Sequence, residues 1–219
     1  SSAKPVLSVT IDDESSSGYF RGLPLALDTD YSFSQQIFTP EEIGMAGTIT
    51  AISFHRSSSN LSAFSMEGVR VYLQCTDRES FSSNMNDLRG DREQISISDW
   101  AYNGDFSAAE GSEWLTVTLN QPFAYNGQNN LLISIYDPTP GCIDGSFGFT
   151  KHEVSAKRFY SLWCNAFYPG DNPDPANAIP FDSFLTDGHY HYNPESLCWC
   201  WVNDIRLNIV PNPYRNPVS

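Results

Sequence analysis

Apolar and polar side chains alternate with a period of two in short runs spread along the chain. The pattern is regular in residues 7–11, 69–74, 115–119 and 205–209, where Leu, Val or Ile occupies every second position. Such strands have one apolar face and belong to antiparallel sheets whose other face meets solvent, packed in pairs. The pattern therefore predicts an all-β fold, an antiparallel β-sandwich.

Helix is scarce between these runs, which are bounded by clusters of Gly, Pro, Asn and Asp. One short helical turn is expected after Thr39, with Thr39 as the N-cap, Pro40 at the first helical position and Glu42 completing a capping box. Gly44 and Gly47 follow at expected turn positions, where a side chain would clash.

The length of 219 residues fits one large domain better than two small ones. We expect an N-terminal segment with a strand at 1–18, the sandwich at 19–210 and a tail at 211–219. Residues 165–192 are rich in Pro, Asp and Asn and are interpreted as one long loop excursion. Loops of this length are uncommon without a function, so this excursion is the first place to look for a binding site.

The chain is strongly acidic, with 12 Lys and Arg against 26 Asp and Glu and a formal net charge of −14. This charge repels nucleic acid and anionic membrane surfaces, and it keeps a secreted protein soluble. No apolar run approaches the ~18 to 20 residues that span a bilayer. The chain begins at Ser1 without a Met, which favours a processed N-terminus and an exported protein, secreted or at the cell surface, with a lipid anchor upstream left open.

Five cysteines make an odd number, so one thiol is expected to stay outside any intramolecular pairing. Cys75 lies in a strand-like run and is expected to be a buried, inert thiol. Cys142, Cys164, Cys198 and Cys200 lie in the last third of the chain, where one or two disulfides would form in an oxidising compartment.

The stretch before and through Cys200 allows a second arrangement. If residues 193–196 form a hairpin loop, the side chains of His189, His191, Cys198 and Cys200 share one face, close enough to draw a zinc site. A disulfide that involves Cys198 or Cys200 and free thiols are the alternatives, and the disulfide is favoured for an exported domain.

Aromatic residues make up 14% of the chain, and many of them follow residue 158. Most are expected to be core. Aromatic rings beside Asp and Asn side chains are also the way in which binding sandwiches hold sugar rings. The candidates for such a ligand-binding platform are Tyr168, Tyr190, Tyr192 and Trp199.

No catalytic motif is present: the chain has no G-x-S-x-G elbow, H-E-x-x-H, Walker loop or G-x-G-x-x-G. His55 and His152 lie in strand-like surroundings without an evident Ser or Cys partner and are interpreted as surface or hydrogen-bonded histidines. The oxygen-rich candidates for a calcium site are Asp12, Asp13, Glu14, Asp28, Asp30, Asp171, Asp174 and Asp204, and none of them forms an EF-hand loop.

Several phrases stand in an order that resembles a known family. They are YSFSQQIF at 31–38, EIG at 42–44, GTITAISF at 47–54, VYL at 71–73, SFSS at 80–83, PFAYNG at 122–127, NLLI at 130–133, NPDP at 172–175 and DIRL at 204–207. Together they resemble the adhesin-type β-sandwich modules of secreted and surface proteins of Bacteroidetes bacteria, similar to the cleaved-adhesin modules that accompany gingipain proteases. The resemblance covers about Tyr19 to Val210.

The resemblance implies a jelly-roll sandwich, export, a noncatalytic binding or adhesion role, and structural calcium, with Asp204 of the closing strand as a calcium residue. The Cys-Trp-Cys stretch at 198–200 and the His-rich approach to it depart from the family pattern. We therefore expect a noncatalytic secreted or surface module that binds a glycan or a protein through its loops. The alternatives are a carbohydrate-active enzyme on a jelly-roll scaffold and a structural spacer module.

Overall fold

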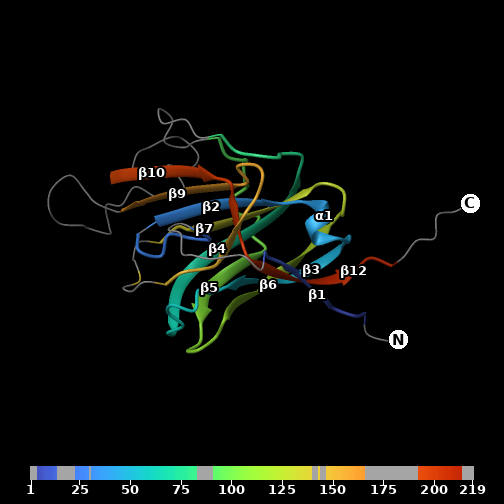
Figure 1. Cartoon of the computed structure of the whole chain (residues 1–219), viewed down its shortest axis with the longest axis horizontal. Coiled ribbons are helices and arrows are strands. Elements are labelled where there is room, and N and C mark those ends of the chain that lie inside the picture. Colours follow the sequence, from blue (N-terminus) through green and yellow to red (C-terminus); the bar gives the residue numbers. More distant parts are fainter. Residues whose placement is uncertain are drawn as a thin grey trace, which may run out of the picture.

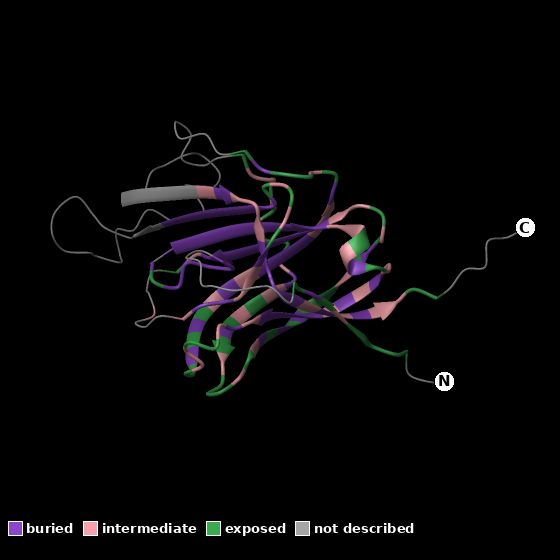
Figure 2. Cartoon of the chain, viewed as in Figure 1, coloured by how far each residue is buried: buried purple, intermediate pink, exposed green. Residues whose placement is uncertain are grey.

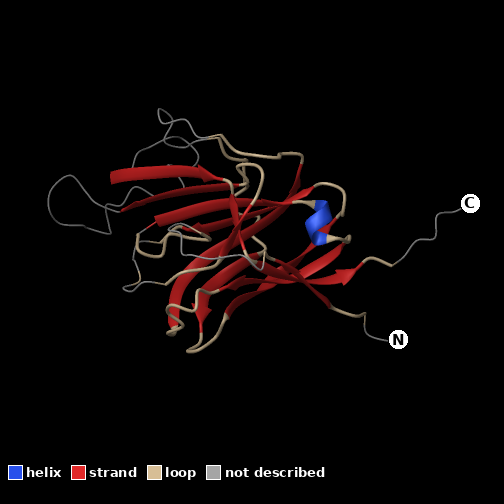
Figure 3. Cartoon of the chain, viewed as in Figure 1, coloured by secondary structure: helices blue, strands red, loops and turns tan. Residues whose placement is uncertain are grey.

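The protein is described here from a computed structural model, in which residues 4–13, 23–29, 31–82, 91–139, 143, 147–165 and 192–213 are described. Within these residues the chain forms two large antiparallel sheets and one short two-stranded ribbon (Figure 1). Figure 3 shows that strands dominate and that helix α1 lies at one end of them. The predicted all-β antiparallel sandwich is confirmed, while its assignment as a jelly roll stays a prediction.

The first sheet has four strands. Their order is β1 (Leu7–Ile11), β12 (Ile205–Pro211), β3 (Gly47–His55) and β6 (Trp114–Tyr125). Three of the four alternating runs that the sequence shows, at 7–11, 115–119 and 205–209, lie in this sheet.

The second sheet has six strands. Their order is β10 (Tyr192–Trp199), β9 (Phe159–Asn165), β2 (Tyr31–Phe38), β7 (Asn130–Asp137), β4 (Phe64–Thr76) and β5 (Tyr102–Ala108). Strands β5 and β6 belong to different sheets but lie side by side, since the Gln121 amide donates to the Ala101 carbonyl at 2.9 Å. The two sheets are therefore joined along this side.

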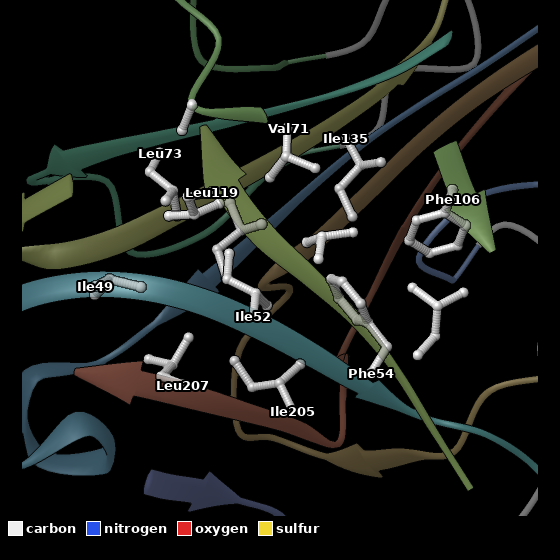
Figure 4. Packing of buried hydrophobic residues seen from close by; sticks show 14 of the residues in the cluster. Ile49, Ile52, Phe54, Val71, Leu73, Phe106, Leu119, Ile135, Ile205 and Leu207 are labelled. Carbon is white, nitrogen blue, oxygen red and sulfur yellow. The ribbon is translucent and has the colours of Figure 1, made fainter. Parts of the chain in front are cut away.

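The main core fills the space between the two sheets. Its strands contribute every second side chain, so β6 and β12 alternate between buried and more exposed positions, a banding that Figure 2 shows in colour. Figure 4 shows the packing of side chains from both sheets: Ile49, Ile52, Phe54, Ile205 and Leu207 on one side and Val71, Leu73, Phe106 and Ile135 on the other. Removing each such side chain from water contributes about 1.5 to 3 kcal/mol to folding.

The outer face of the six-stranded sheet is also apolar, which corrects the expectation of a solvated face. Tyr72 of β4 is 3% exposed although it lies between the inward-facing Val71 and Leu73. It belongs to a second buried cluster, whose strand residues are Tyr31, Phe33, Ile37, Tyr72, Leu132, Tyr136, Tyr160, Leu162 and Cys198. The side chains of Ile95, Ile97 and Trp100 pack against this cluster.

Residues 91–101, here named the outer segment, are held on this face by polar groups. The Tyr72 hydroxyl donates to the Ile97 carbonyl at 2.6 Å. Arg78 forms ion pairs with Asp91 and Glu93, both at 2.9 Å. The outer segment therefore shields from solvent a sheet face that would be exposed in an ordinary two-layer sandwich.

Strand β2 is buried along its whole length because both of its faces are covered. Its two glutamines face opposite ways. The Gln35 amide group accepts from the Glu93 backbone N–H at 2.8 Å and donates to the Glu93 carbonyl at 2.9 Å, which fastens the outer segment. The Gln36 amide group accepts from the Asn203 backbone N–H at 2.7 Å and donates to the Asn203 side-chain oxygen at 2.7 Å.

Helix α1 (Pro40–Ile43) follows β2 as predicted. Thr39 caps it, Pro40 lies in its first turn, and Glu42 completes the capping box by accepting from the Thr39 backbone N–H at 2.8 Å. Gly44 ends the helix with a φ of 79°, and a Cβ on Gly47 would lie 2.3 Å from the Val210 carbonyl oxygen of β12. Both glycines are therefore required by backbone geometry, as expected.

Within the described residues, no helix has the length and apolar character that crossing a membrane requires.

Candidate functional site

The candidate site is built around the ribbon formed by β8 (Lys151–Glu153) and β11 (Trp201–Asn203). The antiparallel register places Trp201 opposite Glu153 and Val202 opposite His152. Because directly paired residues share a face, Trp201 and Glu153 point to one side of the ribbon while Val202 and His152 point to the other. The ribbon is fixed to β2 through Asn203 and Gln36.

His152 and Asp204 form a buried pair at the end of the ribbon. His152 is 8% exposed and Asp204 is 2% exposed, and His152 Nδ1 lies 2.7 Å from Asp204 Oδ1. The backbone of Asp204 is fixed at both ends, since its N–H donates to the Thr150 carbonyl at 3.1 Å and its carbonyl accepts from the His55 N–H at 3.1 Å. The pair is therefore held rigidly where β11 leads into β12.

The partner of Nδ1 determines what the other ring nitrogen of His152 offers. An ionised carboxylate only accepts hydrogen bonds, so Nδ1 carries the proton that is shared with Asp204. In a neutral imidazole, Nε2 is then a hydrogen-bond acceptor. It makes no hydrogen bond within the part of the chain that the structure describes.

A second buried pair, Glu42 and Arg158, lies close by. The two terminal guanidinium nitrogens of Arg158, Nη1 and Nη2, donate to the Glu42 carboxylate. Nη1 also donates to the Ile37 carbonyl at 3.1 Å. Burial raises the pKa of Glu42, but hydrogen bonds from Arg158 and Thr39 and the Arg158 charge outweigh it, so the pKa lies below its usual 4.5. Arg158 is thus anchored by Glu42 and the Ile37 carbonyl.

An open pocket of about 680 Å³ lies where the end of β1, helix α1 and β8 meet. Its polar lining comes from Thr10, Asp12, Asp13, Glu42, His152, Glu153 and Arg158. Four carboxylates therefore face one guanidinium around the pocket, and that guanidinium is already paired with Glu42.

Trp199 and Trp201 form an aromatic ledge. The two rings stack with centroids 5.0 Å apart and planes 3° from parallel, and both residues are partly exposed. The Lys151 ammonium lies 3.6 Å from the Trp201 ring centroid, a cation–π contact. Burial lowers the pKa of Lys151, although the charges of Glu153 and Asp204 oppose the change. Trp201 lies opposite Glu153 in the ribbon, and Glu153 is also one of the residues that line the pocket.

Among the predicted platform residues, Trp199 is described in full and lies in this ledge. Tyr192 begins β10, but its side chain lies outside the described residues, as do Tyr168 and Tyr190. Most of the predicted excursion at 165–192 likewise lies outside them. The platform formed by all four residues stays a prediction.

The predicted hairpin at residues 193–196 is wrong. These residues lie inside β10, which pairs with β9 from Tyr192 to Trp199 with a register shift between Tyr192 and Glu195. The zinc arrangement loses its geometric basis with the hairpin, and His189 and His191 lie outside the described residues. Across the described ranges, no three His, Cys, Asp or Glu side chains are grouped to hold a metal ion.

The disulfide predicted for Cys198 or Cys200 is not formed, because both side chains are free thiols. Cys198 points into the apolar cluster on the outer face of the six-stranded sheet, and burial raises its pKa to about 11. Cys75 is also a free thiol and is half-buried against the main core rather than fully buried. Cys142 and the side chain of Cys164 lie outside the described residues.

The two histidines singled out by the sequence are both hydrogen-bonded, as expected. His55 Nδ1 lies 2.8 Å from the Thr150 hydroxyl, and its ring packs against Trp114. The structure places Asp204 in the pair with His152, and its assignment as a calcium residue stays a prediction. Asp12 and Asp13 lie in the lining of the acidic pocket.

The sequence reasoning missed Lys151, Glu153 and Arg158 as members of the site. Strand β8 has only three residues, so no alternation longer than Lys151-His152-Glu153 was available to reveal it. The one usable signal was the capping-box residue Glu42, whose charged partner, Arg158, lies 116 positions away along the chain.

Comparison with known proteins gave no relative: no family model matches the chain, and no curated protein or solved structure matches it.

Proposed function

We propose that this protein is a noncatalytic, secreted or cell-surface binding module that recognises a glycan or a protein. The contact surface in this proposal is the ledge of Trp199 and Trp201 together with the acidic pocket beside it. The one observation that carries it is the parallel stack of two partly exposed tryptophans, one of which pairs with the pocket-lining Glu153.

The ledge is suited to binding because it is rigid before any ligand arrives. The Trp201 ring centroid lies 5.0 Å from that of Trp199 and 3.6 Å from the Lys151 ammonium. The Trp201 ring is therefore held by two neighbours. A ligand that meets a ring held in this way loses little conformational entropy from the protein side, and tryptophan is enriched at the centres of binding surfaces.

The pocket contributes the polar part of the contact. Carboxylate oxygens from the residues after β1, from α1 and from β8 accept hydrogen bonds from a ligand that also contacts the ledge. Aromatic area combined with a few converging polar groups is the usual composition of a binding site.

The test is a binding screen against glycan and protein arrays with the wild-type chain, Trp199→Ala and Trp114→Ala. Trp114 is the matched control, since it is also a partly exposed, packed tryptophan but lies on β6 and belongs neither to the ledge nor to the pocket lining. We expect Trp199→Ala to weaken binding at least about tenfold, in line with tryptophan hot spots, and Trp114→Ala to leave it unchanged. Equal loss in both variants would contradict the proposal, and absence of any ligand would favour a structural spacer.

A carbohydrate-active enzyme is the second candidate, favoured by one feature of the pocket. It brings carboxylates of β1 and β8 together with an imidazole oriented by a buried carboxylate, and paired acids are what glycoside hydrolysis requires. An enzyme would release reducing ends from a bound oligosaccharide, and Asp12→Asn or Glu153→Gln would stop the release. A binding module leaves every bound oligosaccharide intact.

A further inference from the structure

The outer segment covers an apolar sheet face although none of its own residues is fully buried. Residues 91–100 are all exposed or partly exposed. Ile95 and Ile97 pack against the buried cluster of the sheet, while the residues before, between and after them are exposed. In that cluster Leu132 and Tyr136 are 0% exposed. The cover is therefore one extended layer of chain with solvent on its other side.

The strand register shows which residue of the sheet lies beneath this layer. Gln35 of β2 and Thr76 of β4 both bond Glu93, the former through its backbone and the latter through its carboxylate at 3.3 Å. Their partners on β7 are the residues two positions after and two positions before Leu132. Because side chains two positions apart share a face, Glu93 spans β7 above Leu132.

Side chains, rather than a strand ladder, attach the outer segment to the sheet. In the part of the chain that the structure describes, no backbone-to-backbone hydrogen bond joins residues 92–100 to the sheet. The polar attachments come instead from Gln35, Arg78 and the Tyr72 hydroxyl, and the Arg78 side chain is itself 21% exposed. Segments with few buried contacts open at a lower free energy than the strands of a core.

The main core does not depend on the outer segment. No residue from 91 to 100 belongs to the main core, which lies on the opposite face of the six-stranded sheet. Strand β7 contributes Leu131, Ile133 and Ile135 to that core and keeps its ladders with β2 and β4 whether or not its outer face is covered. Opening of the outer segment therefore disrupts the second cluster alone.

We infer that the outer segment is a hinged cover, which opens as a unit while the sandwich stays folded and thereby exposes an apolar face of the six-stranded sheet. Its fixed ends are two backbone hydrogen bonds, from the Asp91 N–H to the Ser82 carbonyl at 3.3 Å and from the Ala101 N–H to the Val71 carbonyl at 2.8 Å. The inference goes beyond the proposed function and involves neither the ledge nor the pocket.

Two adjacent residues of β7 serve as matched reporters of this opening. Leu132 lies in the cluster under the outer segment and Ile133 in the main core, and they are 0% and 1% exposed. Leu132→Cys and Ile133→Cys each place one thiol on one of these faces. Labelling of the native protein by N-ethylmaleimide is followed by mass spectrometry of the peptide that contains the site, so the native cysteines do not interfere.

We expect the thiol at position 132 to react at least about tenfold faster than the thiol at position 133, since the cover opens more often than the whole chain unfolds. At low urea the rate at position 132 should change little, because opening exposes little surface, while the rate at position 133 rises steeply. The wild-type chain provides the same test without a substitution. Exchange of the Glu93 amide, which is bonded to Gln35, should depend less on urea than exchange in β7.

Two further substitutions locate the event. Val117→Ala truncates a main-core side chain of β6, so it should accelerate labelling at position 133 about tenfold and leave position 132 unchanged. Gln35→Leu removes the bonds to Glu93 and should accelerate labelling at position 132 at least about tenfold.

Equal acceleration of both reporters by Val117→Ala, or the same steep urea dependence at both, would show that Leu132 is uncovered only when the whole chain unfolds, and would overturn the inference. Labelling at position 132 that ignores Gln35→Leu would overturn it as well. None of these measurements involves a ligand, so the inference and the proposed binding function fail separately.

Discussion

A single glutamate connects helix α1 to the candidate site. Glu42 closes the capping box with Thr39 and also accepts hydrogen bonds from the two terminal guanidinium nitrogens of Arg158. Because Arg158 lines the pocket, a residue that first serves the helix also fixes one wall of the proposed binding surface.

Replacing Glu42 by Gln keeps the shape and the capping group but removes the charge. We expect Glu42→Gln to lower the free energy of unfolding at pH 7 by about 1.5 to 3 kcal/mol, the range for hydrogen bonds to charged groups. Urea unfolding measures this loss. Glu41→Gln is the control, since Glu41 is exposed one position earlier in the same turn.

The pH dependence of that loss follows from the pKa of Glu42. The folded-state pKa lies below 4.5, so the ionised carboxylate stabilises the fold above this pH and the stabilisation is lost as the pH falls through the folded-state value. The difference between wild type and Glu42→Gln should therefore shrink on acidification below pH 4.5. A difference that stays constant down to about pH 3 would show that the ion pair is not its source.

Cys198 provides a residue-scale test of the outer apolar cluster. With a pKa of about 11, only about one thiol in a thousand is ionised at pH 8, and the side chain is also buried. We expect iodoacetamide to leave Cys198 unmodified in the native protein and to modify it fully in urea, as read by mass spectrometry. Resistance in urea that disappears only after reduction would reveal a disulfide and contradict the structure.

At the scale of elements, the strands of the four-stranded sheet could be predicted from alternation because one of their faces is exposed to solvent. The same reasoning predicted a solvent-exposed face for the other sheet and missed that the outer segment packs on it. Strand β2 carries apolar side chains on both faces, with Phe38 in the main core and Phe33 in the outer cluster. A period of two does not reveal which partner covers each face.

Strand β10 shows why turn residues misled the hairpin prediction. Asn193 and Pro194 are typical of turns, yet they lie in a strand at the edge of the six-stranded sheet, beside a register shift. An edge strand tolerates proline because one side of its backbone needs no partner in the sheet. The candidate site was equally hard to predict, since its pieces come from β1, α1, β8 and β11 and meet only in the folded chain.

The reciprocal hydrogen bonds between Gln35 and Glu93 are expected to hold the outer segment on its sheet. Gln35→Leu leaves the Glu93 N–H and carbonyl without these partners, so we expect a loss of about 2 to 4 kcal/mol and faster hydrogen exchange at the Glu93 amide. Gln94→Leu, at an exposed neighbouring position, is the control. Unchanged exchange at Glu93 in Gln35→Leu would mean that apolar packing alone holds the segment.

At the scale of the whole molecule, the middle of the six-stranded sheet is buried on both faces, and hydrogen bonds connect it to the ribbon. Gln36 and Asn203 tie the ribbon to β2, and Asp204 ties it to β3 through His55. The ledge is thus mounted on the ends of β10 and β11, while the pocket also takes residues that follow β1 and β8. Mounting the ledge on strands favours a preformed surface.

Hydrogen exchange of the wild-type chain, with and without the tightest ligand from the arrays, tests most directly where the partner binds. The account predicts slower exchange in β8, in β11 and at the end of β1 around Asp12, with the tips of β4 and β5 unchanged. Protection confined to those tips, or to any surface that excludes the ribbon, would contradict it.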